Sequence, residues 1–159
     1  MEPLARCRLT FAFFVAVVVA LATVVVVFTV TRSSGRGLDV PLTAVVVTVI
    51  GVAFAALGRR ARGRLHCGSR VDALRSYRAR LVRCGFLAEV PAAAGFVAFL
   101  LTDNIAVFMV GAGFAVIGLA TIAPSRRNLE AEEHEFARRG CRQSLVGALL
   151  DVDEPPRVL

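Results

Sequence analysis

Four long apolar blocks dominate this chain of 159 residues and restrict what it can fold into. They cover about residues 9–31, 38–57, 84–101 and 105–123, and Glu89 is the one acidic residue in the interior of a block. Roughly 20 consecutive apolar residues are enough for a helix to cross the hydrocarbon core of a bilayer. Because lipid offers no partner to free backbone groups, spans of this kind are helical. The sequence therefore predicts an all-α membrane protein, a bundle of four transmembrane helices.

The segments that border the blocks support this division of the chain. Pro41 falls in the first turn of the second block, where a missing N–H costs little. Residues 102–104 read as a tight turn, and Pro124 ends the fourth block. We expect a transmembrane domain over residues 1–124 and a cytoplasmic tail over residues 125–159, partly helical and disordered at its end.

Residues 59–83 form the polar centre of the chain, with nine Arg against one acid, Asp72. From about Arg70 the apolar residues recur at helical spacing, which predicts a basic helix that continues into the third span. The acidic segment 130–135 of the tail is a candidate to dock on this basic segment. All 19 basic residues are Arg.

Arginines near the spans predict the orientation in the membrane. One side carries the two Arg of the N-terminal segment, the nine of residues 59–83, and Arg126 with Arg127. The other side carries Arg32 and Arg36. Since cytoplasmic segments are enriched in basic residues, both termini and the large loop are predicted to be cytoplasmic.

The same arginines are predicted to contact anionic lipid headgroups, because basic residues beside spans are attracted to them. The candidates in the loop are Arg59, Arg60, Arg62, Arg64, Arg75 and Arg78. The net charge of +7 is assigned to topology and lipid contact, and no nucleic acid is expected as a partner.

Glu89 is the candidate ionisable site inside the membrane, about five residues or 7–8 Å into the third span. Pro91 follows two residues later and cannot donate a backbone hydrogen bond, so the helix is loosened at this level. Glu89 has three open interpretations. It pairs with a nearby arginine, it is protonated and bonds to a neighbouring helix, or it is a proton or cation site in transport. The candidate arginine partners are Arg83, Arg126 and Arg127.

Residues 87–101 resemble the ion-carrying helix of the proteolipid (c) subunits of rotary ATPases, with a carboxylate before small residues and a Leu/Val run. The first two spans lack the glycine repeat of that family and the loop lacks its Arg-Gln-Pro turn, so its function is not carried over. Glu89, residues 101–104 and residues 124–126 are together similar to small uncharacterised bacterial four-span proteins. That resemblance covers about residues 70–130 and implies a bacterial inner membrane, without a known activity.

Small residues recur on one face of each span, and such faces allow close helix packing in lipid. They predict packing within the bundle, a homo-oligomer, or both. The sets are Ala12, Ala16 and Ala20; Thr43, Gly51 and Ala55; Ala88 with Ala92 and Ala94 with Ala98; and Gly111 with Ala115.

No enzyme signature appears in the sequence. His66, Cys67, Cys84, His134 and Cys141 match no usual zinc spacing, and no Cys-x-x-Cys occurs. Serines lie only outside the spans, and neither His has an acid nearby in a span. We expect no catalytic site, no metal and no cofactor.

Three functions remain open at this stage. The first is a structural or accessory helix bundle, for which a homo-oligomer and a complex with another membrane protein both stay open. The second is a small proton- or cation-coupled transporter that uses Glu89. The third is a platform that recruits anionic partners through the Arg-rich loop.

Overall fold

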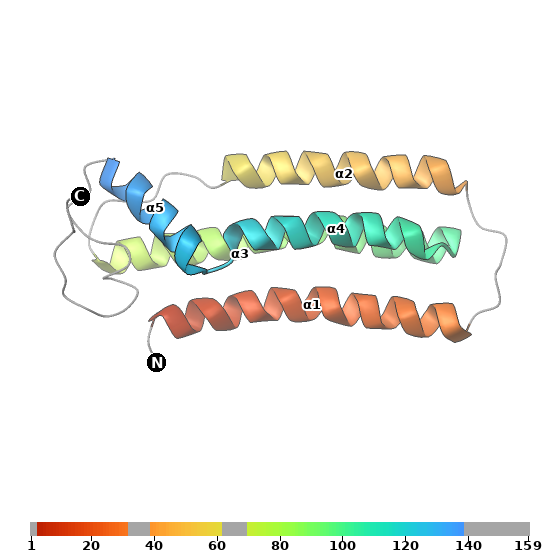
Figure 1. Cartoon of the computed structure of the whole chain (residues 1–159), viewed down its shortest axis with the longest axis horizontal. Coiled ribbons are helices and arrows are strands. Elements are labelled where there is room, and N and C mark those ends of the chain that lie inside the picture. Colours follow the sequence, from red (N-terminus) through yellow and green to blue (C-terminus); the bar gives the residue numbers. More distant parts are fainter. Residues whose placement is uncertain (1–2, 32–38, 62–69, 139–159) are drawn as a thin grey trace.

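The computed structural model of the chain describes residues 3–31, 39–61 and 70–138. These residues form five helices (Figure 1). They are α1 Pro3–Thr31, α2 Val40–Ala61, α3 Arg70–Thr102, α4 Ile105–Ile122 and α5 Arg126–Arg138. The first four are each long and apolar enough to cross a membrane, and each covers nearly all of one of the four blocks predicted from the sequence. The prediction of an all-helical protein with four membrane spans is therefore confirmed.

Helices α3 and α4 form the central pair of the bundle and share its largest contact. Helix α1 packs on one side of this pair and α2 on the opposite side (Figure 1). Successive long helices run antiparallel, so the start of α1, the end of α2 and the end of α4 lie at the same end as α5. Below, this end is called the polar end.

The central pair packs closely because glycines face backbone on both helices. Gly111 of α4 abuts the carbonyl oxygen of Pro91, and a Cβ at position 111 would lie 3.0 Å from the Cα of Gly95. A Cβ at Gly118 would lie 2.9 Å from the Cβ of Ala88. Small residues thus bring two helices together where lipid gives them no hydrophobic reason to associate.

The outer helices are fixed by aromatic side chains that fill glycine sites. The ring of Phe14 in α1 lies where Gly85 of α3 has no side chain. In the same way the ring of Phe114 in α4 lies against Gly51 of α2. Each contact inserts a large side chain into a gap on the facing helix, which fixes both the depth and the register of the outer helix.

The predicted small-residue faces divide into inward and outward sets. Ala88, Ala92, Ala98, Gly51, Gly111 and Ala115 are buried in the bundle. Ala12, Ala16 and Ala20 are exposed along the outside of α1, and Ala55 is exposed on α2. The small residues of α3 and α4 therefore build the bundle, whereas the stripe on α1 is left over.

Helix α3 is longer than a bilayer span. Its 33 residues correspond to about 50 Å, against about 30 Å of hydrocarbon. The basic segment from Arg70 is the first part of this one helix and runs into the apolar part without interruption. The described residues contain no separate helix between α2 and α3.

Local capping explains where α3 and α4 begin and end. Asp103 has a positive φ of 53°, in the left-handed region that Asp tolerates better than most residues. The Asn104 side chain accepts a hydrogen bond of 2.9 Å from the Ala106 N–H and so caps α4. After α4, the Asn128 amide donates to the carbonyls of Ala120 and Ala123. The Ala120 carbonyl belongs to the last turn of α4, where carbonyls lack a donor within the helix.

Candidate functional site

Glu89 lies in α3, inside the bundle and near its polar end. Its neighbour Ala88 is opposite Gly118, which precedes the last residue of α4, Ile122, by four positions. Four residues of helix correspond to about 6 Å. Glu89 therefore lies about one helical turn from the level at which α4 ends.

Its surroundings are apolar on the side that faces α1 and α4. The residues one position before and three positions after it, Ala88 and Ala92, belong to a single buried cluster. The other buried members are Phe14, Val18, Ala115 and Leu119. Both carboxyl oxygens of Glu89 are buried, and neither has a hydrogen-bond partner in the described residues. A buried polar group without a partner is costly, which makes Glu89 the most unusual side chain of the bundle.

In the described residues, none of the arginines predicted as partners of Glu89 forms a hydrogen bond with it. Arg83, Arg126 and Arg127 are all exposed, and the described part of the chain shows no hydrogen bond from them to Glu89. Pro91 is buried in α3, two residues after Glu89. Because proline has no N–H, the carbonyl of Leu87 loses its donor in the helix. The carboxyl and this carbonyl are thus two poorly satisfied polar groups within one turn of α3.

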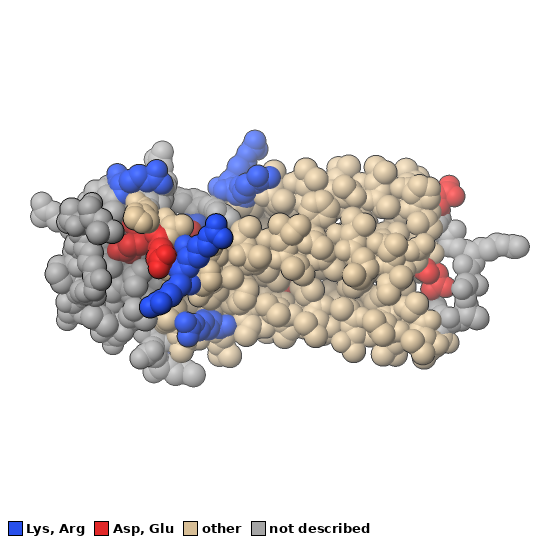
Figure 2. Space-filling model, viewed as in Figure 1, with Lys and Arg blue, Asp and Glu red and all other residues tan. Residues whose placement is uncertain are grey.

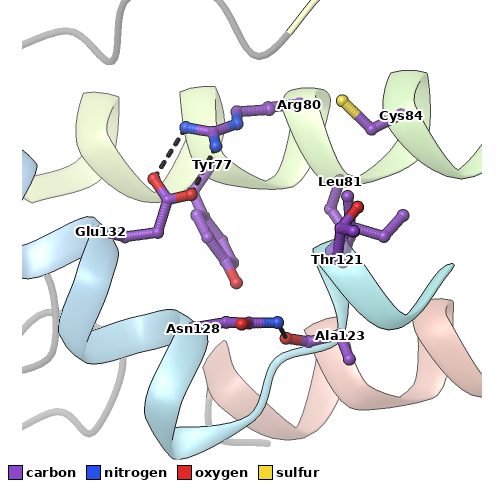
Figure 3. A pocket seen from close by; sticks show the side chains of 9 residues that line it. Tyr77, Arg80, Leu81, Cys84, Thr121, Ala123, Asn128 and Glu132 are labelled. Carbon is purple, nitrogen blue, oxygen red and sulfur yellow. Dashed lines mark hydrogen bonds and ion pairs between the residues drawn. The ribbon is translucent and has the colours of Figure 1, made fainter. Parts of the chain in front are cut away.

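A second polar cluster lies at the polar end, where α5 folds back on α3 (Figure 3). The guanidinium of Arg80 donates through Nη1 to Glu132 Oε2 at 2.8 Å, and through Nη2 to Oε1. The two groups form a planar fork, the geometry in which arginine binds carboxylates most strongly. This pair confirms, for one residue on each side, the expectation that the acidic segment docks on the basic one.

An apolar contact supports the same docking. Leu129 of α5 is 8% exposed and packs in a cluster with residues from α1 and α3. The cluster is Leu4, Cys7, Tyr77, Leu81 and Leu129. That these residues meet could not be predicted from the sequence, because they come from three helices that are far apart in the chain.

A small hollow lies beside the ion pair (Figure 3). It is lined by Tyr77, Arg80, Cys84, Thr121, Asn128 and Glu132, among others. Its volume is about 20 Å³, which is space for water. Pockets that bind organic ligands have volumes of about 300–1,000 Å³, so this hollow is far too small to be one of them.

Charged residues gather at the polar end of the bundle, as Figure 2 shows. The predicted headgroup contacts Arg59, Arg60, Arg75 and Arg78 are all exposed. Arg62 and Arg64 lie outside the described residues. Among the described residues, the charges at the opposite end are Asp39 and Asp103, both acidic.

The cysteines and histidines do not form a site in the described residues. No group of three or more His, Cys, Asp or Glu could hold a metal ion there. Cys7 and Cys84 are buried thiols on different helices, and His134 is exposed. His66, Cys67 and Cys141 of the zinc set, and the tail beyond Arg138, lie outside the described residues.

Comparison with known proteins identifies no relative: no family model, no curated protein and no solved structure matches the chain. The fold itself defines the class. The chain is a small multi-span membrane protein whose four apolar helices are packed together in a bundle.

Proposed function

We propose that this protein is a structural or accessory helix bundle of a bacterial inner membrane, without enzymatic activity. The close packing of α3 against α4 carries this proposal. Gly111 abuts the Pro91 carbonyl, so α3 and α4 leave no space for a substrate between them at this level. The hollow at the polar end, of about 20 Å³, is also too small for one.

Such a bundle acts through what it binds in the membrane. The stripe of Ala12, Ala16 and Ala20 on the outside of α1 is suited to a second helix, from another copy or from a partner protein. A photo-crosslinking amino acid at Ala16 tests this in native membranes, with exposed Val49 of α2 as the control. The proposal predicts a discrete adduct from position 16. Identical lipid-only products from both positions would count against it.

The proposed orientation places the polar end, and with it both termini, in the cytoplasm. The arginines of this end support it, because basic residues are retained on the cytoplasmic side. Green fluorescent protein fused after residue 138 folds and fluoresces only in the cytoplasm. A periplasmic phosphatase fused at the same point should be inactive. The reverse pattern would invert the proposed orientation.

A specific observation favours a second function, a small proton- or cation-coupled transporter. The observation is that both Glu89 oxygens are buried without a hydrogen-bond partner in the described residues. Ionisable groups inside membrane spans are commonly functional for that reason. Proton or cation flux through reconstituted vesicles, lost in Glu89→Gln with the fold intact, is the result that would favour this function.

A third function is recruitment of anionic partners to the membrane by the exposed arginines of the polar end. Each arginine near an anionic surface contributes about 1 kcal/mol of attraction. The candidates are Arg59, Arg60, Arg75 and Arg78, with Arg62 and Arg64 of the same segment. Binding of an acidic partner should fall steeply between low and high salt, since exposed charges are screened.

A further inference from the structure

We propose that Arg80 is a binding site for the phosphate group of an anionic membrane lipid, and that Glu132 occupies this site while α5 is docked. Lipid phosphate and the carboxylate of Glu132 would then compete for one guanidinium. The inference goes beyond the proposed function, and requires only that the bundle spans a bilayer.

The position of Arg80 along the bundle is the first argument. Helix α4 has 18 residues, a length of about 27 Å, which nearly equals the hydrocarbon thickness of about 30 Å. Its ends therefore mark the two boundaries of the hydrocarbon. Arg80 lines the same hollow at the polar end as Thr121 and Ala123, which lie at the end of α4 (Figure 3). Arg80 thus lies at the level where lipid phosphates lie.

The chemistry of the fork is the second argument. An arginine binds phosphate and carboxylate in the same bidentate manner, through two parallel N–H donors. Glu132 shows that this geometry is available at Arg80, with one of the two bonds at 2.8 Å. The side chains of Arg80 and Glu132 are 18% and 20% exposed, so the pair is held between helices but is not sealed. One acidic group can replace the other without opening the apolar core.

The way α5 is attached is the third argument. The contacts of Leu129 with its apolar cluster and of Asn128 with the end of α4 hold the first turn of α5. Glu132 holds the next turn through Arg80. If lipid phosphate binds Arg80, the first turn stays attached while the attachment of the second turn is weakened.

Arginines around the site supply the local concentration of lipid. Arg75, Arg78 and Arg83 are exposed on the same helix as Arg80, and Arg59 and Arg60 end α2 at the same end of the bundle. Anionic headgroups accumulate around such residues. In a membrane of zwitterionic lipid this accumulation is absent, so Glu132 stays paired with Arg80 and α5 stays docked.

Hydrogen–deuterium exchange of the full chain in lipid nanodiscs tests the inference. In phosphatidylcholine, amides of residues 132–138 should be protected, and replacement of half the lipid by phosphatidylglycerol should speed their exchange by roughly two- to fivefold, the size expected for one partly exposed ion pair. Amides of α4 serve as the internal reference for an intact bundle. Equal exchange of α5 in the two lipids would overturn the inference.

Variants separate lipid binding from simple loss of the ion pair. Glu132→Gln should speed the exchange of the α5 amides in both lipids. The purified variant should also retain more phosphatidylglycerol than the wild type. Arg80→Gln should expose α5 in both lipids but retain less phosphatidylglycerol than Glu132→Gln. Arg78→Gln removes the same charge from an exposed position of the same helix and should leave α5 docked in phosphatidylcholine. If Glu132→Gln retains no more lipid than the wild type, the competition does not exist.

Soluble anions separate the possible sources of the phosphate. In phosphatidylcholine nanodiscs, inorganic phosphate is compared with sodium chloride at equal ionic strength. No release of α5 by either salt, with release by phosphatidylglycerol, supports the lipid as the ligand. Release by phosphate alone supports recognition of the phosphate group and overturns the restriction to lipid. Equal release by both salts overturns the site, since screening alone then explains the effect.

Discussion

Gly111 of α4 faces the backbone carbonyl oxygen of Pro91 in α3, and a methyl group at position 111 would overlap that oxygen. Backbone cannot move aside as a flexible side chain can. The two central helices therefore owe their close approach at this level to Gly111. Pro91 and Gly111 thus form a direct backbone contact between α3 and α4.

Gly111→Ala should destabilise the bundle by about 3 kcal/mol, at the upper end of the cost of overpacking. Gly113→Ala is the matched control, because nothing lies within 4 Å of a Cβ at that position. It should change the stability by less than about 1 kcal/mol, in the stabilising direction, since Ala favours helix over Gly. Unfolding in detergent, followed by circular dichroism, measures both. Equal stability of the two variants would show that α3 and α4 do not meet at Pro91.

Gly51→Ala should cost less, about 1 kcal/mol, because the obstacle is the ring of Phe114 and not backbone. The Cγ of that ring is 2.6 Å from the position of the added Cβ. Combined with Phe114→Ala, the same substitution should have almost no further effect, because contacting residues couple. Gly58→Ala, with nothing within 4 Å of its Cβ, is the control. Strict additivity of the Gly51 and Phe114 substitutions would argue against this contact.

Glu89→Leu should leave the bundle as stable as the wild type or raise its stability by about 1–2 kcal/mol, because it removes a buried polar group without a partner. The alternative, an ion pair with Arg83, Arg126 or Arg127, predicts the opposite sign. Removing one partner of a buried pair costs about 3–5 kcal/mol. The unfolding midpoint in detergent distinguishes the two results. Arg83→Gln, at an exposed position, is the control and should change nothing measurable.

The Arg80–Glu132 pair should contribute about 0.5–1 kcal/mol to the docking of α5, as partly exposed pairs do. A double-mutant cycle with Arg80→Gln and Glu132→Gln isolates this coupling, with trypsin cleavage after Arg138, at the end of α5, as the readout. Each single variant should be cleaved faster than the wild type, and the double variant little faster than either. The coupling should shrink as salt is raised. Independent, additive effects on cleavage would mean that the two residues do not interact in the membrane-bound protein.

The number and placement of the spans follow from hydropathy alone, because a run of about 20 apolar residues has few other uses. The ends of the helices do not. The first span was predicted from residue 9, whereas α1 begins at Pro3, since a helix can continue past the bilayer into polar sequence. The turn at residues 102–104 was predictable because it depends on local chemistry, an Asp at positive φ and an Asn cap.

The faces of the helices were harder to predict than their positions. Small residues at a spacing of four occur both in the Ala12–Ala16–Ala20 stripe and at Gly111 and Ala115, yet only the second set is buried. Spacing identifies a face but does not say which helix covers it. Glu89 stood out in the sequence as a charge in an apolar run. Arg80 did not, because nothing in the sequence distinguishes it from the other arginines of its segment.

Flux through vesicles reconstituted with the purified protein tests whether the bundle is structural or a transporter. Proton and cation flux is measured for the wild type and for Glu89→Gln, with circular dichroism to verify that both are folded. We expect neither protein to raise flux above that of protein-free vesicles. Flux through the wild type would contradict the structural role, and its loss in Glu89→Gln would assign transport to Glu89.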